Sequence, residues 1–315
     1  MLLHDLDFMD LYIRLDREGI ARYKPESRDK GYGNHPVPPE FMAQIGLLTG
    51  EFKRDFHTAE GTFEFGDMRF RCSVKTMENQ ETWAVLRKVN PRVRTLQELG
   101  VANHIIQSLR PLGKRDGLVL VSGATGAGKT TTMYGMLHDY LQRFGGTALT
   151  IEDPVEYRLE GEIGECGYGY QIQVNSDEDW AKEIKRSLRW TPRYILVGEV
   201  RTPEAAEQVL RAATTGHLVF TSVHAGSIEE SLYGLLHLAE QRMGSGGAQH
   251  ILAAGITACL HQSLSPSGPY IRYIFSEEHN NGDPLRALIR ENRIGQINTF
   301  IDKQAARTAQ AARSY

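Results

Sequence analysis

The chain has 315 residues, of which 41% are hydrophobic, and its 36 lysines and arginines against 39 aspartates and glutamates give a formal net charge of -3. This length and apolar content can bury a substantial core and suit two modest domains. The charge excludes an overall basic field that would attract nucleic acid or an anionic membrane, so any such contact must be local.

The cysteines and the N-terminal residues indicate a cellular compartment. Cys72, Cys166 and Cys259 are widely spaced, which excludes a four-cysteine zinc module and argues against a disulfide framework. Residues 1–15 are interrupted by acids and lack both a basic leader and a long apolar run, so we expect no signal peptide and no membrane span there. These features predict a reducing, cytosolic location.

The N-terminal third alternates between strand and helix patterns. One helix is expected from Pro39 to Gly50, because proline is tolerated in a first turn and Phe41, Ile45 and Leu48 share one face. Period-two alternation predicts strands around it, and the turn at residues 17–19 makes the first two a hairpin. These strands span residues 9–15, 20–23, 61–65, 68–75 and 82–89. We therefore expect a small α+β domain over residues 1–90.

A short aperiodic segment separates this domain from the rest of the chain. Residues 91–96 contain Pro91 and show no periodicity, so we place a linker there, followed by an amphipathic helix from about Leu96. The second domain is then expected over residues 97–304. Within it, Gly244–Gly247 has the composition of a mobile loop, and the Ala-rich residues 305–315 that follow the domain are expected to be a flexible tail.

Apolar, β-rich segments alternate with helical patterns in the second domain. Strands are expected at residues 118–122, 148–151, 194–198 and 218–223, with helices after Lys129, over Trp180–Trp190 and from Pro203. Alternation of this kind predicts a parallel sheet covered by helices.

The segment Gly123–Thr130, GATGAGKT, fits the phosphate-loop pattern G-x-x-x-x-G-K-[ST] between a strand and a helix. Backbone N–H groups of such a loop surround phosphates, the lysine reaches the β and γ phosphates, and the hydroxyl ligates Mg²⁺. We therefore predict that the chain binds ATP and Mg²⁺. The nucleotide-binding residues expected in this segment are Gly123, Thr125, Gly126, Ala127, Gly128, Lys129, Thr130 and Thr131, with Thr130 also as a metal ligand.

Carboxylates follow two of the expected strands. Glu152 and Asp153 end one of them, and Glu199 ends another. The carboxyl ends of parallel strands are where ligands bind in open α/β sheets. A hydrolytic site needs one acid to hold Mg²⁺ through water and another to orient the attacking water, and Glu152 and Glu199 can supply both. Either acid alone could equally be a helix cap or a solvated turn residue.

Two histidines flank the strand at residues 218–223. His224 follows its end and shares the sheet edge with the phosphate loop, so it could donate a hydrogen bond to a γ-phosphate oxygen; His217 is expected to cap or pack. In the segment Trp180–Trp190, Arg189 could project toward a nucleotide at a subunit boundary. The default explanation of its basic side chains is a solvated face. They are Lys182, Lys185, Arg186 and Arg189.

Four ordered motifs resemble the secretion and pilus ATPase superfamily, which includes pilus retraction motors, type II secretion ATPases and type IV secretion and conjugation ATPases. They are the phosphate loop GATGAGKTT, the acidic box TIEDPVEY, the Walker B segment ILVGEVR and the histidine box TTGHLVFTSVHAGS. The first domain adds a weaker likeness in MDLYIRL and RFRCS. The resemblance covers nearly the whole chain.

The resemblance implies an α/β fold, with an N-terminal PAS-like domain joined to a RecA-like ATPase core, and a homohexamer with ATP between the two domains. It implies that Glu152 polarises water, Glu199 supports Mg²⁺ and His224 senses the γ-phosphate. It also implies phosphate-compensating arginines among Arg69, Arg71 and Arg87. The implied partner is an inner-membrane platform protein, at the cytoplasmic side of a bacterial inner membrane, and nucleic acid is not expected.

The small number of cysteines limits the branches of the superfamily that this chain resembles. Larger type II and pilus-extension ATPases carry a tetracysteine insert that this chain cannot form, which favours retraction-like or conjugation-type branches. A nucleic-acid translocase with the same core, a non-hydrolysing nucleotide switch and, remotely, a small-molecule kinase remain as alternatives. DNA-stimulated turnover with a steep salt dependence would favour the translocase.

Overall fold

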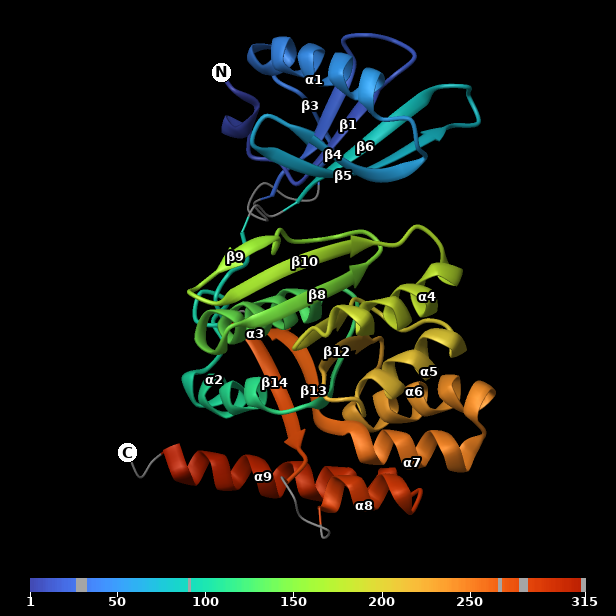
Figure 1. The fold of residues 1–315 in the computed structure, drawn as a ribbon. Helices are drawn as coiled ribbons and strands as arrows, with labels where there is room; N and C mark the ends of the chain where they lie inside the picture. Colours follow the sequence, from blue (N-terminus) through green and yellow to red (C-terminus); the bar gives the residue numbers. More distant parts are fainter. Residues whose placement is uncertain (27–32, 90–91, 266–267, 278–282, 313–315) are drawn as a thin grey trace. The chain divides into compact units, whose positions relative to one another are not determined.

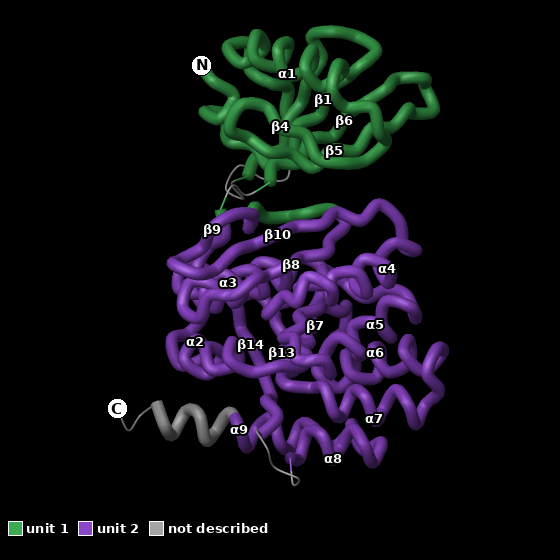
Figure 2. Tube along the Cα trace, in the orientation of Figure 1, with its two compact units in different colours: residues 1–92, 154–158 green, residues 93–153, 159–315 purple. Residues whose placement is uncertain are grey.

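A computed structural model describes residues 1–26, 33–89, 92–265, 268–277 and 283–312, with side chains described up to Gln304. The chain divides into two compact units (Figure 2): unit 1 contains Met1–Arg92 and Pro154–Arg158, and unit 2 contains Val93–Asp153 and Leu159–Tyr315. Asn90 and Pro91, where we placed the end of the first domain and the start of the linker, lie outside the described residues. No helix in the described ranges is both long and apolar enough to cross a membrane.

In its described part, unit 1 is an antiparallel sheet with one face covered by a helix. The strand order is β3-β2-β1-β6-β5-β4. The predicted hairpin is confirmed, since Leu11 of β1 pairs with Tyr23 of β2. The strands are β1 (Asp10–Arg14), β2 (Ala21–Lys24), β3 (His35–Pro36), β4 (Glu60–Phe65), β5 (Met68–Thr76) and β6 (Thr82–Lys88).

The helix of unit 1 starts with the 3₁₀ turn η3 (Pro39–Phe41) and continues as α1 (Met42–Asp55), past the predicted end at Gly50. The apolar stripe carries on through Leu48 to Phe52, and both are buried in the same core as Leu11 and Phe70 of the sheet. Since apolar burial rather than local propensity decides where such a helix ends, the glycine does not stop it.

Unit 2 is built on a mostly parallel sheet with the strand order β14-β13-β7-β12-β11-β8-β10-β9. Pairing from β13 to β10 is parallel, while β14 and β9 add antiparallel strands at the two sides. The expected parallel sheet is therefore confirmed. The strands are β7 (Gly117–Ser122), β8 (Gly146–Glu152), β9 (Gly161–Ile163), β10 (Gly167–Gln173), β11 (Tyr194–Val197), β12 (Leu218–Val223), β13 (Ile256–Ser265) and β14 (Gly268–Phe275).

Helices cover both faces of this sheet (Figure 1). Helix α3 contacts β7, β8, β10 and β12, and α4, α5 and α6 pack in a core with the side chains of the other face, such as Leu118, Ile151 and Val197. The helices are α2 (Asn103–Leu109), α3 (Lys129–Phe144), α4 (Asp177–Ser187), α5 (Pro203–Ala212), α6 (Ile228–Met243), α7 (Ser245–Gly255), α8 (Pro284–Arg290) and α9 (Ile297–Ala312), with 3₁₀ turns η4 (Arg110–Lys114) and η5 (Leu188–Trp190).

Three local expectations differ from the structure. The helix expected from Leu96 begins only at Asn103, because Gly100 with φ of +76° ends a single turn braced by Thr95 and Glu98. The loop expected at Gly244–Gly247 is already helical from Ser245. The tail expected from residue 305 is helical up to Ala312, consistent with the high helix propensity of alanine, and residues 313–315 lie outside the described part.

Candidate nucleotide site

The predicted phosphate loop connects the end of β7 to the start of α3, at the carboxyl edge of the parallel strands. Gly123 requires the absence of a side chain, because a Cβ would lie 2.3 Å from the backbone oxygen of Gln262 on β13. Gly128 has φ of +80° and precedes α3, which then starts with Lys129. The loop therefore turns tightly into a helix N-terminus, the geometry that presents backbone N–H groups to phosphate.

Lys129 is anchored inside the loop that it belongs to. Its Nζ donates to the backbone oxygens of Gly123 (2.9 Å) and Ala124 (3.1 Å) and lies 3.3 Å from His224 Nδ1. Only 7% of the residue is exposed. A bound triphosphate would offer this ammonium charged oxygens in place of neutral carbonyl groups, and charge-assisted hydrogen bonds are the stronger kind.

His224 and Glu199 meet beside the phosphate loop, each following the end of one of the parallel strands predicted from the sequence. His224 Nε2 lies 3.1 Å from Glu199 Oε1, and Nδ1 of the same ring lies 3.5 Å from Thr125 Oγ1. Glu199 Oε2 also accepts a hydrogen bond from Arg201 Nε at 2.9 Å, and this hydrogen bond raises the pKa of Arg201. One contact chain thus joins the loop lysine, an imidazole, a carboxylate and a guanidinium.

Hydrogen bonds from backbone and side-chain groups hold in place the two segments that contain Glu199 and His224. Ser222 Oγ donates to the backbone oxygen of Gly198 at 2.8 Å, next to Glu199. After His224, the Gly226 N–H donates to Glu230 Oε2 at 2.6 Å, and Ser227 caps α6 by accepting from the Glu230 N–H. Both segments leave neighbouring parallel strands, so the sheet determines their spacing.

Glu152 ends β8 and is only 2% exposed. Its Oε1 accepts a hydrogen bond from the hydroxyl of Tyr134, a buried residue of α3. Gln171 Nε2 on β10 donates to the same hydroxyl at 2.9 Å. Glu152 is therefore linked through Tyr134 to the helix that follows the phosphate loop.

Comparison with known proteins places the whole arrangement in one family. The sequence model described as "Type II/IV secretion system protein" matches residues 62–279. The chain belongs to this family.

Relatives within the family match over very different lengths. The type IV pilus retractation ATPase PilT of Pseudomonas aeruginosa is 31% identical over 263 residues, covering 81% of this chain and 73% of that protein. A type II secretion system protein E of Dickeya dadantii is 40% identical over 133 residues, covering 42% of this chain but 26% of that protein. The chain thus spans most of the first relative and about a quarter of the second.

A solved structure titled as the pilus retraction motor PilT with bound ADP superposes with a TM-score of 0.71 at 24% identity, covering 95% of this chain and 87% of that one. At that identity the likeness establishes the fold. The predicted fold class is confirmed: a RecA-like P-loop ATPase core with a smaller N-terminal α+β domain.

Donor chemistry at the site is compatible with Mg²⁺. Thr130 is half-buried in the first turn of α3, and the Glu199 side chain is 20% exposed. Among the described residues no cluster of three or more His, Cys, Asp or Glu could hold a metal by itself. Mg²⁺ at nucleotide sites usually keeps several waters and binds one or two protein groups together with phosphates, so a hydroxyl and one carboxylate are a fitting set.

Of the arginines expected near the phosphates, three belong to unit 1 and one belongs to unit 2. In unit 1, Arg71 of β5 pairs in register with Arg87 of β6, and Arg87 Nε donates to the buried Asp10 at 2.6 Å. Arg69 Nε lies 3.9 Å from Glu64 of the neighbouring β4. In unit 2, Arg189 is exposed on η5, before β11 begins, at the amino edge of the sheet. It cannot meet the phosphate loop of its own unit, which lies at the opposite edge.

Sequence reasoning missed three residues that contact the site. Arg201 could have been noticed, because it lies on the same short segment as Glu199. Gln262 donates to the backbone oxygen of Ala127 at 2.7 Å, and Tyr134 reaches Glu152. Both reach the site from a distance in the sequence, through strand order and helix packing, so no local pattern marks them.

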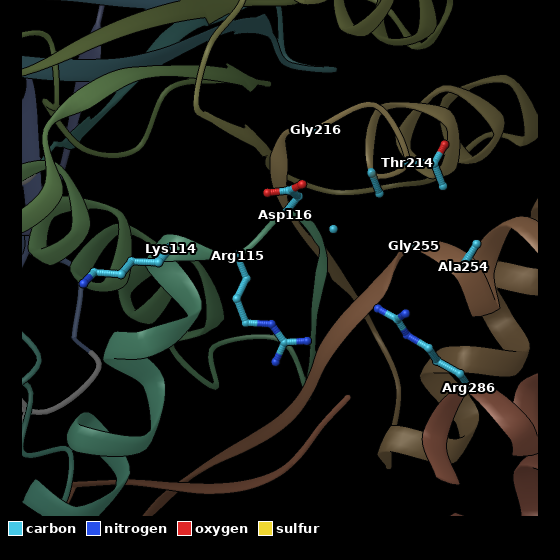
Figure 3. A pocket seen from close by; sticks show the side chains of 10 residues that line it. Lys114, Arg115, Asp116, Thr214, Gly216, Ala254, Gly255 and Arg286 are labelled. Atoms are coloured by element: carbon cyan, nitrogen blue, oxygen red, sulfur yellow. The ribbon is translucent and has the colours of Figure 1, made fainter. Parts of the chain in front are cut away.

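A cavity of about 550 Å³ lies at the amino edge of the sheet, beside the start of β7 (Figure 3). Its charged groups are already engaged. Arg115 donates to the backbone oxygen and hydroxyl of Ser276 (2.8 and 2.7 Å), Arg286 Nε lies 3.3 Å from Asp283, and Asp116 lies 3.1 Å from Arg193. The cavity is lined by Lys114, Arg115, Asp116, Gly117, Ala213, Thr214, Gly216, Ala254, Gly255 and Arg286.

Proposed function

We propose that this chain is an Mg²⁺-dependent ATPase that works as a homohexamer and powers a bacterial pilus or secretion machine, either a retraction-like type IV pilus or a type II, type IV secretion or conjugation system. The observation that carries the proposal is the contact chain from Lys129 through His224 to Glu199 at the phosphate loop. Membership of a family whose relatives are named pilus ATPases supports it.

In the proposed reaction, backbone N–H groups of the loop and the ammonium of Lys129 hold the β and γ phosphates. Thr130 and Glu199 would hold Mg²⁺, which neutralises charge on the phosphate oxygens. Glu152 orients a water and takes its proton as the water oxygen attacks the γ-phosphorus. The bond from that phosphorus to the ADP oxygen breaks, leaving ADP and phosphate. His224, between Lys129 and Glu199, is placed to respond to the γ-phosphate.

Arginines from another copy of the chain would complete the site. Arg189 is exposed at the edge of the sheet opposite to its own phosphate loop, so it can reach a nucleotide only in a neighbouring subunit. Arg69, Arg71 and Arg87 are candidates for the same role from unit 1. We place the ring in the cytoplasm, bound to the inner membrane through a platform protein of the machine.

The basic side chains of α4 do not favour a nucleic-acid translocase. Arg186 lies 2.7 Å from Glu183, and Lys182 lies 3.7 Å from Asp179, within the same helix. The acidic first turn, Asp177–Asp179, offsets the basic face further. A solvated helix face accounts for these residues, and DNA is not expected to stimulate ATP turnover.

One experiment tests the proposal directly. We expect the wild-type protein to hydrolyse ATP with Mg²⁺ and to stop when the metal is chelated, and we expect Glu199→Gln to form ATP-bound rings. Affinity capture of that variant from membranes of its source organism, with Lys129→Ala as the control that cannot hold ATP, should retain a platform protein. ATP binding without any turnover in assembled wild-type rings would instead identify a nucleotide switch.

A further inference from the structure

A series of hydrogen bonds leads to Glu152 from residues that follow the phosphate loop in the sequence, and its last link is buried. Backbone N–H groups of Leu159 and Glu160 donate to Gln171 Oε1 at 2.8 and 3.2 Å. Gln171 Nε2 donates to the hydroxyl of Tyr134, which donates to Glu152 Oε1. Tyr134 is 0% exposed and Glu152 is 2% exposed, so bulk water does not replace these partners.

The backbone N–H groups of Leu159 and Glu160 determine which group donates in each hydrogen bond of this series. A backbone N–H can only donate, so the side-chain oxygen of Gln171 must face Leu159 and Glu160, and its NH₂ group must face Tyr134. The hydroxyl of Tyr134 accepts that hydrogen bond, and its own hydrogen is therefore directed at Glu152. That hydrogen bond holds the carboxylate of Glu152 in one orientation.

Tyr134 also ties Glu152 to the element that holds the phosphates. It lies on α3, which begins with Lys129. The two residues are five positions apart, about 7.5 Å along a helix axis at 1.5 Å per residue. The ammonium proposed to bind phosphate and the phenol that contacts the carboxylate therefore belong to the same helix.

We propose that Tyr134, held by Gln171, is a positioning residue that orients Glu152 for its action on the attacking water. This inference rests on the proposed ATP hydrolysis. Because Tyr134 touches the carboxylate and not the nucleotide, its hydroxyl should matter for the chemical step and not for the affinity for ATP. Positioning by a neighbouring group typically contributes a factor of about ten to a hundred.

The test compares two buried tyrosines of the same helix. Tyr140 is also 0% exposed, and its hydroxyl donates to the backbone oxygen of Leu109 at 2.6 Å, away from Glu152. Tyr134→Phe and Tyr140→Phe each remove one buried hydroxyl from α3. We expect Tyr134→Phe to lower kcat on the order of tenfold with KM and ATP affinity unchanged, and Tyr140→Phe to leave kcat within about twofold of wild type.

A second variant keeps Tyr134 and redirects its hydrogen bond. Gln171→Glu would still accept from the backbone N–H groups, but would offer a second oxygen to the Tyr134 hydroxyl in competition with Glu152, so kcat should fall as in Tyr134→Phe. This variant tests the positioning role of Tyr134 if Tyr134→Phe does not fold. In a Glu152→Gln background, Tyr134→Phe should lower the residual kcat no further.

The outcomes separate this inference from the function on which it rests. If wild type hydrolyses ATP and Tyr134→Phe or Gln171→Glu keeps the wild-type kcat, the positioning role is wrong and the ATPase stands. A rise in KM without a fall in kcat, or an equal fall in Tyr134→Phe and Tyr140→Phe, would also overturn it. Absence of turnover in assembled wild type would overturn both proposals.

Discussion

The two edges of the unit 2 sheet present opposite kinds of surface. At the amino edge lies a cavity of about 550 Å³, large enough for a small ligand, but Arg115 there is hydrogen-bonded to Ser276 and Arg286 is ion-paired with Asp283. At the carboxyl edge the phosphate loop turns over Lys129, whose ammonium faces neutral carbonyl oxygens and an imidazole. The edge with this cavity is thus one whose arginines already contact a serine or a carboxylate.

This difference shows why volume alone does not locate the site. Parallel strands deliver loops and helix N-termini to their carboxyl ends and the C-terminal ends of helices to their amino ends. Residues at the end of α5 and α7, including Thr214 and Ala254, accordingly line the amino-edge cavity. Such helix ends expose carbonyl groups, which repel phosphate, so the amino edge is unsuited to a nucleotide.

Exchanging one lysine at each edge gives the largest expected contrast. Lys129→Ala removes the cation that we propose contacts the phosphates, and we expect ATP turnover to fall about a thousandfold, the scale of losing a charge-stabilising donor. Lys114→Ala at the amino-edge cavity should leave turnover unchanged. Steady-state phosphate release measures both. Comparable losses in the two variants would show that the edges do not differ as we infer.

Substituting Glu199 tests whether this carboxylate of the carboxyl edge takes part in ATP hydrolysis. Glu199→Gln keeps the shape of the side chain but removes the charge that would help to hold Mg²⁺, so we expect turnover to fall about a hundredfold while the phosphate loop keeps ATP bound. Calorimetry with ATP and single-turnover assays separate the two effects. Glu207→Gln on the neighbouring α5, where Glu207 pairs with Arg211 at 3.0 Å, is the matched control. A Glu199→Gln variant that hydrolyses ATP at the wild-type rate would remove this residue from the mechanism.

Local patterns predicted the parts of the site that each lie on one segment. The phosphate loop was readable because its strand, glycines and lysine are consecutive, and Glu199 and His224 were readable because each ends a buried strand. Their meeting at 3.1 Å needed only the rule that parallel strands end at the same edge. The same logic predicted the parallel strands β7, β8, β11 and β12 from their alternating apolar segments.

The unpredicted features depend on strand order. Strand β10 has the sequence GYGYQIQ, with little aliphatic content, yet it pairs in parallel with β8 and brings Gln171 toward Tyr134. Periodicity does not give the neighbour of a strand, so neither residue could be connected with Glu152. For the same reason Gln262, which supports the loop from β13, gave no signal.

A histidine exchange compares the two ends of a single strand. His224→Gln removes the ring between Lys129 and Glu199, and we expect turnover to fall about tenfold, as for other groups that orient a site. His217 precedes the same strand, β12, with its Nδ1 2.6 Å from the backbone oxygen of Pro192. His217→Gln should therefore change stability and not turnover. A larger kinetic effect at His217 than at His224 would contradict the edge assignment.

The smallest kinetic effect is expected at the amino-edge cavity, where Arg115 bonds to Ser276. Arg115→Met leaves the Ser276 groups without these donors, so we expect the free energy of unfolding to fall by about 2 kcal/mol. Turnover per folded molecule should stay at the wild-type value, because the proposed nucleotide site lies at the opposite edge. Urea denaturation followed by circular dichroism measures the first quantity, and phosphate release on the purified folded protein measures the second. Unchanged stability together with reduced turnover would mean that the amino-edge cavity participates in the reaction, and that the contrast between the two edges is false.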